Sequence, residues 1–199
     1  MPAKLTDADF KEAAKILKCD VPAIKAVAEV ESSGDGFLSD GRIKVLFEGH
    51  WFFKYTDGKY AASHPTICYP KWTKEHYTKG ANDDVRGAGE LARLHTAMGL
   101  DKKGALLSAS YGKFQIMGFN FAICGFTTIE SFYQDMLKNE LEHLKAFCGY
   151  INGNALDRAL REHDWAALAY GYNGKDYRHN RYDEKLANAY KKYAAQPAS

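Results

Sequence analysis

The chain has 199 residues and a formal net charge of +2, and 46% of its residues are hydrophobic against 26% charged. These proportions are those of a globular protein with a core, and they exclude an intrinsically disordered chain. A chain of this length buries ~70% of the surface that its unfolded form exposes, so we expect a single domain over residues 1–199. The small net charge does not favour a dense polyanion, and we expect no nucleic-acid partner.

The N-terminus and the cysteines indicate where the chain is made. No apolar run approaches the ~18 residues that cross a bilayer, and the N-terminus has no basic patch followed by an apolar core. We therefore expect no membrane insertion, no signal peptide and synthesis in the cytoplasm. The four cysteines are widely spaced without a C-x-x-C pair, which predicts reduced, mostly buried thiols and no zinc site, and leaves open one disulfide after export.

Two helices are predicted in the first 34 residues. The first covers about Asp7 to Leu17, because Thr6 is a suitable N-cap and apolar residues recur along one face. The second begins after Asp20 and ends near residues 33–34, where a run rich in Ser and Gly breaks the helix.

A strand or small hairpin is predicted from Gly41 onward. Ile43, Val45 and Phe47 alternate with polar residues, which is the period of a half-buried strand. Glu48 has the opposite parity to this apolar face, so its side chain is expected in solvent or in a cleft. Residues 55–84 show no clear period and are interpreted as an ordered excursion of underived conformation.

Helical patterning returns after residue 90 and dominates the rest of the chain. It covers residues 91–98 and 101–107, is interrupted by a tight Gly-containing segment at 110–118, and resumes in short helices at about 155–162, 165–172 and 182–194. The longest helix is predicted over residues 128–150, and its buried side is expected to consist of Phe132, Met136, Leu137, Leu144, Phe147 and Cys148. The fold class is therefore mainly α (α+β), one helical domain with a small β-hairpin.

Glu31 is the most informative residue of the chain. The apolar residues Ile24, Val27 and Ala28 repeat at helical spacing, and the next position of their stripe is Glu31. Glu29 points to the opposite, solvated side. A carboxyl group held against apolar walls favours its neutral form and can donate a proton to a leaving group. The alternative is structural, an inward Glu neutralised by an Arg or capping a backbone end.

Other chemistries lack their motifs. The histidines have no H-E-x-x-H spacing, which disfavours a zinc peptidase, and no metal site is expected. No G-x-S-x-G elbow or G-x-x-x-x-G-K-[ST] phosphate loop occurs, so nucleotide chemistry is not expected either.

Three blocks occur in a recognisable order: Glu31-Ser32 at a helix end, residues 112–116 with the pattern Gly-x-x-Gln-Ile, and residues 170–174 with Tyr-Asn-Gly. This order resembles the lysozyme-like superfamily. The wider segments 30–36, 46–50, 108–120 and 172–174, with the Asp-Trp-Ala block at 164–166, are similar to the N-acetylmuramidase domain of bacteriophage endolysins over nearly the whole chain. Two positions depart from the family pattern, Ser33 for Gly and Tyr111 for Trp, so the sugar-stacking surface could differ.

The resemblance implies an enzyme that hydrolyses the β-1,4 bond between N-acetylmuramic acid and N-acetylglucosamine in peptidoglycan and thereby lyses the host cell. It implies peptidoglycan glycan strands as the partner, no cofactor, and one catalytic domain without a separate wall-binding domain. The enzyme would be made in the host cytoplasm and reach the wall in the periplasm after membrane permeabilisation. A monomer is the default expectation.

Glycoside cleavage requires two carboxyl groups with separate roles. Glu31 suits the general acid. Glu48 is the candidate for the second, as a base that orients water or as an electrostatic partner, although it could be a structural Glu beside His50. Asp35 and Asp40 are its rivals. A separation of the two carboxyls of ~5 Å would indicate retention and ~6.5–9.5 Å inversion of configuration.

Five further residues are predicted to bind substrate. Gln115 can hold an acetamido group or a water, and Gly112 before it would let the backbone approach the sugar. Tyr172 and Asn173 could orient the acid or the substrate. Two more tyrosines beside the motifs could stack on pyranose faces, although plain packing is the more common role of such residues, and these are Tyr111 and Tyr177.

Two other functions are compatible with the same blocks. A lytic transglycosylase uses one Glu as both acid and base and forms 1,6-anhydromuramyl products. A non-catalytic peptidoglycan-binding module would keep the fold without the activity.

Overall fold

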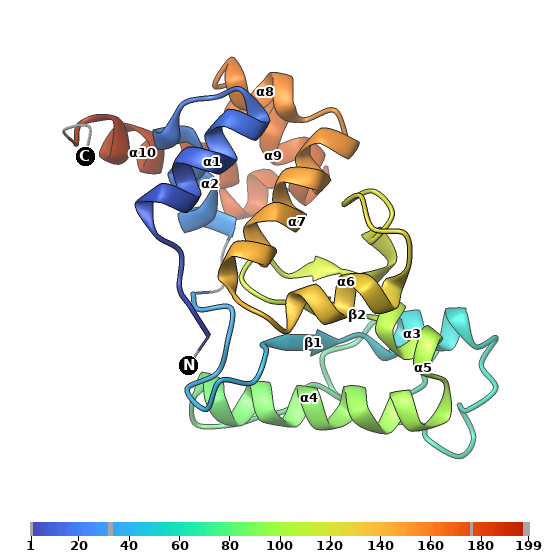
Figure 1. Ribbon diagram of the computed structural model, residues 1–199. Helices are drawn as coiled ribbons and strands as arrows, with labels where there is room; N and C mark the ends of the chain where they lie inside the picture. Colours follow the sequence, from blue (N-terminus) through green and yellow to red (C-terminus); the bar gives the residue numbers. More distant parts are fainter. Residues whose placement is uncertain (1, 32–33, 176, 197–199) are drawn as a thin grey trace.

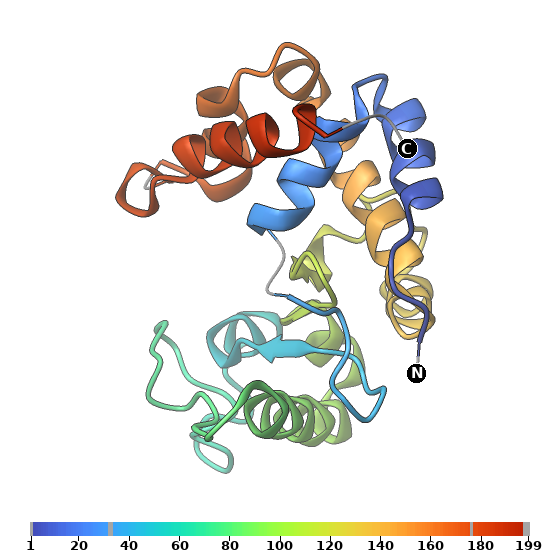
Figure 2. The same cartoon turned by 90° about the vertical axis from the view of Figure 1, so that its left-hand side faces the viewer.

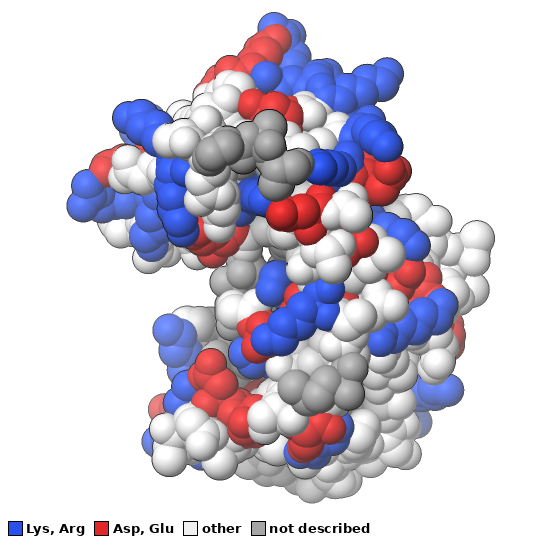
Figure 3. All heavy atoms as spheres, turned by 60° about the vertical axis from the view of Figure 1, so that its left-hand side comes forward, with Lys and Arg blue, Asp and Glu red and all other residues white. Residues whose placement is uncertain are grey.

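The computed structural model describes residues 2–31, 34–175 and 177–196, and of residue 173 only the backbone. The chain forms two lobes (Figures 1 and 2), and the space-filling view shows a hollow between them (Figure 3). Five helices form the upper lobe, namely α1 (Asp7–Leu17), α2 (Val21–Glu31), α8 (Asp157–Arg161), α9 (Trp165–Asn173) and α10 (Tyr182–Ala194). The lower lobe contains strand β1 (Val45–Phe47) and helices α3 (Gly49–Tyr55), α4 (Asp83–Leu100) and α5 (Lys102–Leu107).

The remaining elements join the lobes. They are strands β2 (Ala109–Tyr111) and β3 (Ile116–Met117), helices α6 (Ile129–Met136) and α7 (Glu140–Gly153), and the 3-10 turns η1 (Gly118–Asn120) and η2 (Tyr177–Asn180). Helix α7 contacts α1 at one end and α6 at the other, so it connects the helical layer above the groove with the sheet below it (Figure 1). The predicted mainly α fold with a minor β element is confirmed, and the sheet has three strands.

The two N-terminal helices begin where the sequence predicts. The Thr6 side chain accepts a hydrogen bond from the Asp9 backbone N–H, and the Asp9 carboxylate accepts one from the Thr6 backbone in return. Helix α1 then ends at Lys18, which adopts a left-handed conformation with φ 55°. The Asp20 carboxylate accepts from the Ala23 N–H at the start of α2, and these caps account for the agreement with the sequence.

The predicted strand exists, but it pairs with a distant segment. The sheet has the order β1-β2-β3 and is antiparallel, with Val45 opposite Tyr111 and Tyr111 opposite Ile116. In place of the predicted small hairpin there is an isolated antiparallel bridge, between Phe37 and Ile43. Glu48 is not part of the strand, because the chain turns there into α3 and Glu48 becomes the residue before that helix.

The predicted long helix over residues 128–150 is wrong, because it is two helices. Thr128 caps α6, and the Asn139 side chain caps α7 by accepting from the Glu142 N–H. Between them Leu137 is 38% exposed and not part of the buried side. The longest helix is α4 with 18 residues. Helix α3 was not predicted, because its run of aromatic residues lacks a helical period.

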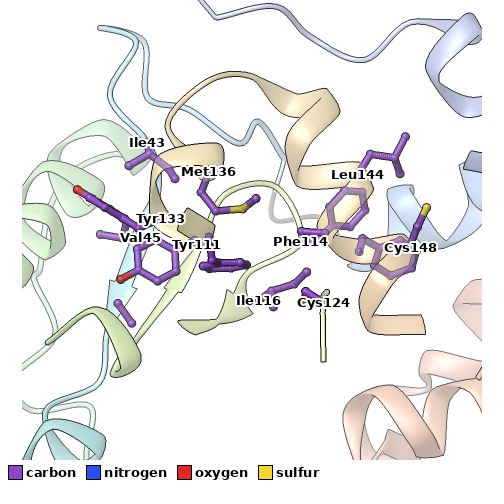
Figure 4. Packing of buried hydrophobic residues seen from close by; sticks show 14 of the residues in the cluster. Ile43, Val45, Tyr111, Phe114, Ile116, Cys124, Tyr133, Met136, Leu144 and Cys148 are labelled. Atoms are coloured by element: carbon purple, nitrogen blue, oxygen red, sulfur yellow. The ribbon is translucent and has the colours of Figure 1, made fainter. Parts of the chain in front are cut away.

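The core lies between the sheet, α6 and α7. Tyr111 is buried at the centre of it, in edge-to-face contact with Phe132 and Tyr133, and its hydroxyl donates to the Leu106 carbonyl (Figure 4). Among the described residues no helix is long and apolar enough to span a membrane. All four cysteines are free thiols in the structure, and three of them are buried.

His143 on α7 holds two loops at once. Its ring stacks on Phe37 at 4.9 Å, and a Cβ on either Gly36 or Gly112 would come within 2.6 Å of the imidazole. The Nδ1 atom accepts from the Lys113 N–H at 3.1 Å, and Nε2 lies 2.8 Å from the Met136 carbonyl, which can only accept. The ring is therefore the neutral tautomer with its proton on Nε2. Burial lowers the pKa of His143 from its ordinary 6.5, whereas the nearby Glu140 acts in the opposite direction.

This pKa predicts that acid destabilises the fold. The pKa of His143 is about 6.5 in the unfolded chain and lower in the folded chain. The contribution of neutral His143 to the free energy of unfolding is therefore complete above pH 6.5 and decreases as the pH falls below that value. The free energy of unfolding in urea, compared between pH 7 and pH 5.5, should decrease less in His143→Gln than in wild type. The exposed His95→Gln serves as the control and should keep the wild-type decrease. An identical decrease in all three proteins would contradict this role.

Candidate active site

Glu31 lies at the C-terminal end of α2 and faces a cavity of about 310 Å³, the Glu31 cavity. Helix α2 is held against α1 and α10, so its last turn projects from the upper lobe toward the sheet (Figure 2). The other lining residues are uncharged at neutral pH, namely Phe114, Gln115, Ile116, Met117, Asn120, Tyr150, Tyr172 and Tyr182. Figure 3 shows the hollow between the lobes to which this region belongs. Glu31 is the one carboxylate among the described lining residues.

Gln115 reaches the cavity from the loop between β2 and β3. Its backbone has φ 47°, a left-handed conformation that is uncommon for a residue with a side chain. The side-chain amide is fixed at both ends, because Oε1 accepts from the Ser110 hydroxyl at 2.8 Å and Nε2 donates to the Gly112 carbonyl at 2.8 Å. One amide hydrogen and one lone pair are left over for a ligand.

Tyr172 reaches the same cavity from α9. Its hydroxyl donates to the Phe114 carbonyl at 3.2 Å, and its ring contacts Tyr150 edge to face. Burial, and after it the negative charge of Glu31, raise the pKa of Tyr172 well above its ordinary value. The same two causes raise the pKa of Tyr182. Both phenols are therefore protonated at neutral pH, and both lie close enough to Glu31 to respond to its charge.

The loop after Glu31 is tied to the hairpin that carries Gln115. Lys113 donates to the Gly34 carbonyl at 3.0 Å, and its ammonium lies 3.3 Å from Glu140. The buried Glu140 also accepts from the Gly36 N–H at 2.8 Å and from the Leu5 N–H at 3.2 Å. These bonds hold residues 34–36 against the hairpin and α7. Gly112 in the hairpin packs on His143, and a Cβ at this position would clash with the imidazole.

A second cavity of about 260 Å³, the Tyr77 cavity, adjoins the first because Gln115 lines both. Its walls come from β1, the N-terminal turn of α4 and the segment before α4, and they include Lys44, Leu46, Tyr77 and Glu90. Together the two cavities form a groove that runs from α10 across the hairpin to α4.

Glu48, the predicted second carboxylate, does not line either cavity. Its side chain is 13% exposed, both carboxylate oxygens lie 2.8 Å from the Tyr77 hydroxyl, and Oε2 lies 3.3 Å from His50 Nδ1. Its contact with the groove thus passes through Tyr77. The rivals lie elsewhere. Asp35 is ion-paired with Lys4 and Asp40 with Arg42, and neither lines the Glu31 cavity.

Two of the remaining predicted substrate-binding residues, Tyr111 and Tyr177, do not line the Glu31 cavity. Tyr111 is 1% exposed and has no ring face at the surface, because it fills the core. Tyr177 is also buried, next to Tyr170, and its hydroxyl accepts from Arg178. For both, the structure supports the packing role. The side chain of Asn173, like Ser32 and Ser33, lies outside the described part of the chain.

Sequence reasoning did not single out Tyr150, Tyr182 or Asn120 at the Glu31 cavity, nor Tyr77 in the adjoining one. Asn120 carried a signal, since it ends the block of residues 108–120. Tyr150 and Tyr182 carried none, because a tyrosine at the boundary of a helical stripe is ordinarily a packing residue. Among the described residues no group of three or more His, Cys, Asp or Glu side chains is arranged to hold a metal ion.

Comparisons with known proteins agree with this geometry. A family profile described as Muramidase, N-acetylmuramidase, matches residues 20–194. The crystal structure of the Burkholderia AP3 phage endolysin is 37% identical and superposes with a TM-score of 0.87, covering 98% of this chain and 74% of that one. None of the curated proteins compared with this chain matches it.

Removing the buried Glu140 carboxylate should loosen the loop after Glu31. In Glu140→Ala, the N–H groups of Gly36 and Leu5 and the Lys113 ammonium lose their acceptor, so we expect a loss of about 3 kcal/mol in the free energy of unfolding by urea. Glu140→Gln keeps part of the acceptor and should lose less. Glu12→Ala, which breaks the exposed ion pair with Lys15, should change stability by less than ~0.5 kcal/mol. Equal stability of Glu140→Ala and Glu12→Ala would contradict the anchoring role.

Proposed function

The chain belongs to the N-acetylmuramidase family and is a glycoside hydrolase of the lysozyme type that acts on peptidoglycan, and we propose that it cleaves the β-1,4 bond between N-acetylmuramic acid and N-acetylglucosamine with Glu31 as general acid. The observation that carries the proposal is the Glu31 cavity. It places one carboxyl group, a fixed amide and two protonated phenols around a space open to the groove.

The surroundings of Glu31 suit a proton donor. The other described lining residues of its cavity are apolar or uncharged, and such walls favour the form of a carboxyl group that carries its proton. In the proposed reaction that proton passes to the bridging oxygen as the bond from the anomeric carbon to this oxygen breaks. Water then adds its oxygen to the anomeric carbon and gives up a proton, which restores Glu31. Gln115 supports this step with its remaining amide hydrogen, which suits the carbonyl of an acetamido group.

Glu48 supports the site indirectly in this proposal. Its carboxylate already accepts a hydrogen bond from the Tyr77 hydroxyl and lies beside His50, so it has less capacity to orient a water. In this proposal Glu48 holds the Tyr77 hydroxyl at the edge of the groove and does not touch the reacting atoms. The stereochemical outcome depends on which side of the sugar the water approaches.

The biological role that we propose is lysis of a bacterial cell. A muramidase without a membrane-spanning helix in its described residues meets peptidoglycan once the membrane has been permeabilised. We propose that the enzyme works as a monomer, because both walls of the groove are built from one chain.

Glu31→Gln should remove the acid and keep the fold. We expect the release of reducing ends from purified sacculi to fall by about 10²–10⁴-fold, which is the usual contribution of general acid catalysis. Far-UV circular dichroism and the melting temperature should stay close to wild type. Clearing of outer-membrane-permeabilised cells should be lost in parallel.

Glu29→Gln is the matched control for this experiment. Glu29 lies on the same helix but points outward, where it accepts from Lys192 and Tyr193. This variant should keep full activity. Wild-type activity in Glu31→Gln, or an equal loss in both variants, would overturn the assignment of the acid.

One observation favours a second candidate, a lytic transglycosylase. Glu31 is the one carboxylate among the described residues of its cavity, and a transglycosylase requires a single Glu that acts as acid and then as base. In that reaction the 6-hydroxyl of muramic acid replaces water, and the product is a 1,6-anhydro sugar.

Mass spectrometry of the released muropeptides separates the two reactions. We expect products with a reducing end, which are heavier by one water than their anhydro counterparts. Sodium borohydride should then add two hydrogens to each product, because only a free reducing end is reduced. Products that resist borohydride and lack the water would establish the transglycosylase instead.

A further inference from the structure

Trp72 is exposed in a way that packing does not explain. It lies in the segment between α3 and α4, and 57% of its surface is accessible, far more than for most large hydrophobic residues of the chain. Part of this segment rises along the open side of the groove in Figure 2. Exposing an indole ring to water is unfavourable, which makes this tryptophan a candidate for a ligand contact.

The segment that carries Trp72 is anchored on both sides. Before it, the buried Tyr69 accepts the Gly49 N–H at 3.3 Å and packs its ring on His76. After it, the Tyr77 hydroxyl donates a hydrogen bond to the Glu48 carboxylate. The anchors attach the segment to the start of α3, so Trp72 is presented on a fixed loop.

The ring of Trp72 is itself oriented. The Lys74 ammonium lies 5.7 Å from the ring centroid. Burial and the Glu48 carboxylate raise the pKa of Tyr77, and the Trp72 indole acts in the opposite direction, which places the indole near the Tyr77 hydroxyl. Trp72 thus lies between Lys74 and Tyr77, and Tyr77 is held by Glu48. A ring oriented before binding loses little conformational entropy when a ligand stacks on it.

Trp72 lies in the chain between two residues that line different cavities, Pro70 and Tyr77. Tyr77 lines the cavity next to the one that holds Glu31, and Gln115 joins these two cavities. The cavity of Pro70 measures about 560 Å³ and is also lined by His50, which contacts Glu48. A glycan strand is a polymer, so sugars beyond the cleaved bond extend along the groove, and the segment of Trp72 borders it.

We propose that Trp72 is a stacking platform for an N-acetylated hexosamine of the glycan strand, at a distance of at least one sugar from the cleaved bond. Tyr77 and Glu48 are positioning residues that hold this platform. The indole face covers the apolar C–H face of the pyranose, and the Lys74 ammonium is available to a ring substituent. The inference rests on the proposed function for its substrate class.

Binding is measured without turnover in the Glu31→Gln protein, with purified sacculi and with the N-acetylglucosamine tetramer as probes. Adding Trp72→Ala should raise the Kd for both by about tenfold, equivalent to ~1.4 kcal/mol. Adding Trp72→Phe should restore most of the affinity, because the phenyl ring keeps a stacking face. Ile16→Ala is the control. It removes an exposed large apolar side chain of α1 that lines none of the cavities described above, and binding should be unchanged.

Each outcome has a distinct meaning. An unchanged Kd in Trp72→Ala, with sacculi binding intact, would overturn the platform. If the Glu31→Gln protein remains active on sacculi, the proposed acid is wrong, but the effect of Trp72 on binding to the tetramer still decides the platform. Loss of ordered structure in Trp72→Ala would show in circular dichroism. Trp72→Leu, which keeps an apolar side chain but has no ring face, then decides the matter: it should raise Kd, whereas the Ile16→Ala control should not.

The positioning residues are tested in the otherwise wild-type enzyme. Tyr77→Phe removes the hydroxyl that joins Trp72 to Glu48, and we expect KM for sacculi to rise with kcat unchanged. Glu48→Gln should raise KM by less than Tyr77→Phe does, with kcat unchanged, because the amide oxygen can still accept a hydrogen bond from Tyr77. A fall in kcat with unchanged KM in Glu48→Gln would instead identify Glu48 as the second catalytic carboxylate and contradict its positioning role.

Discussion

The groove depends on the packing of α7 against the two loops that carry the motif residues. His143 fits between Gly36 and Gly112 so closely that neither position could accept a side chain, and Glu140 accepts the Gly36 N–H while it pairs with Lys113. One face of one helix therefore sets the distance between the end of α2 and the β2–β3 hairpin. Because both contacts are buried and polar, they hold this distance only while each donor keeps its acceptor.

Glu31, Glu90 and Glu140 each lie in line with the apolar residues of their helix, so all three look alike in the sequence. Glu90 accepts from the Phe47 and Thr78 N–H groups and pairs with Arg93, so it is structural. Glu140 is structural in the same manner. Glu31 differs because it lines a cavity in the groove. An inward acid in a sequence is thus a candidate for catalysis, and the partners that tertiary structure brings to it decide between the two roles.

The two lobes supply different residues to the groove. The upper lobe supplies Glu31 and Tyr172, whereas the hairpin and the segment before α4 supply Gln115 and Tyr77. Gln115 lines both cavities and adopts a strained left-handed conformation, which the hairpin stabilises through Ser110 and Gly112. Gln115 therefore lies between Glu31, the proposed acid, and the distal wall of the groove.

The sequence by itself determined what short-range interactions control. Caps such as Thr6 and Asp20 define α1 and α2, and the helical period places Glu31 on the inner side of α2, because these features depend on residues within one or two turns. Tertiary structure decided the rest. Strand β1 pairs with a strand more than 60 residues away, Tyr111 is buried in the core, and Glu48 accepts a hydrogen bond from Tyr77. All three features depend on contacts between distant segments, which no local pattern encodes.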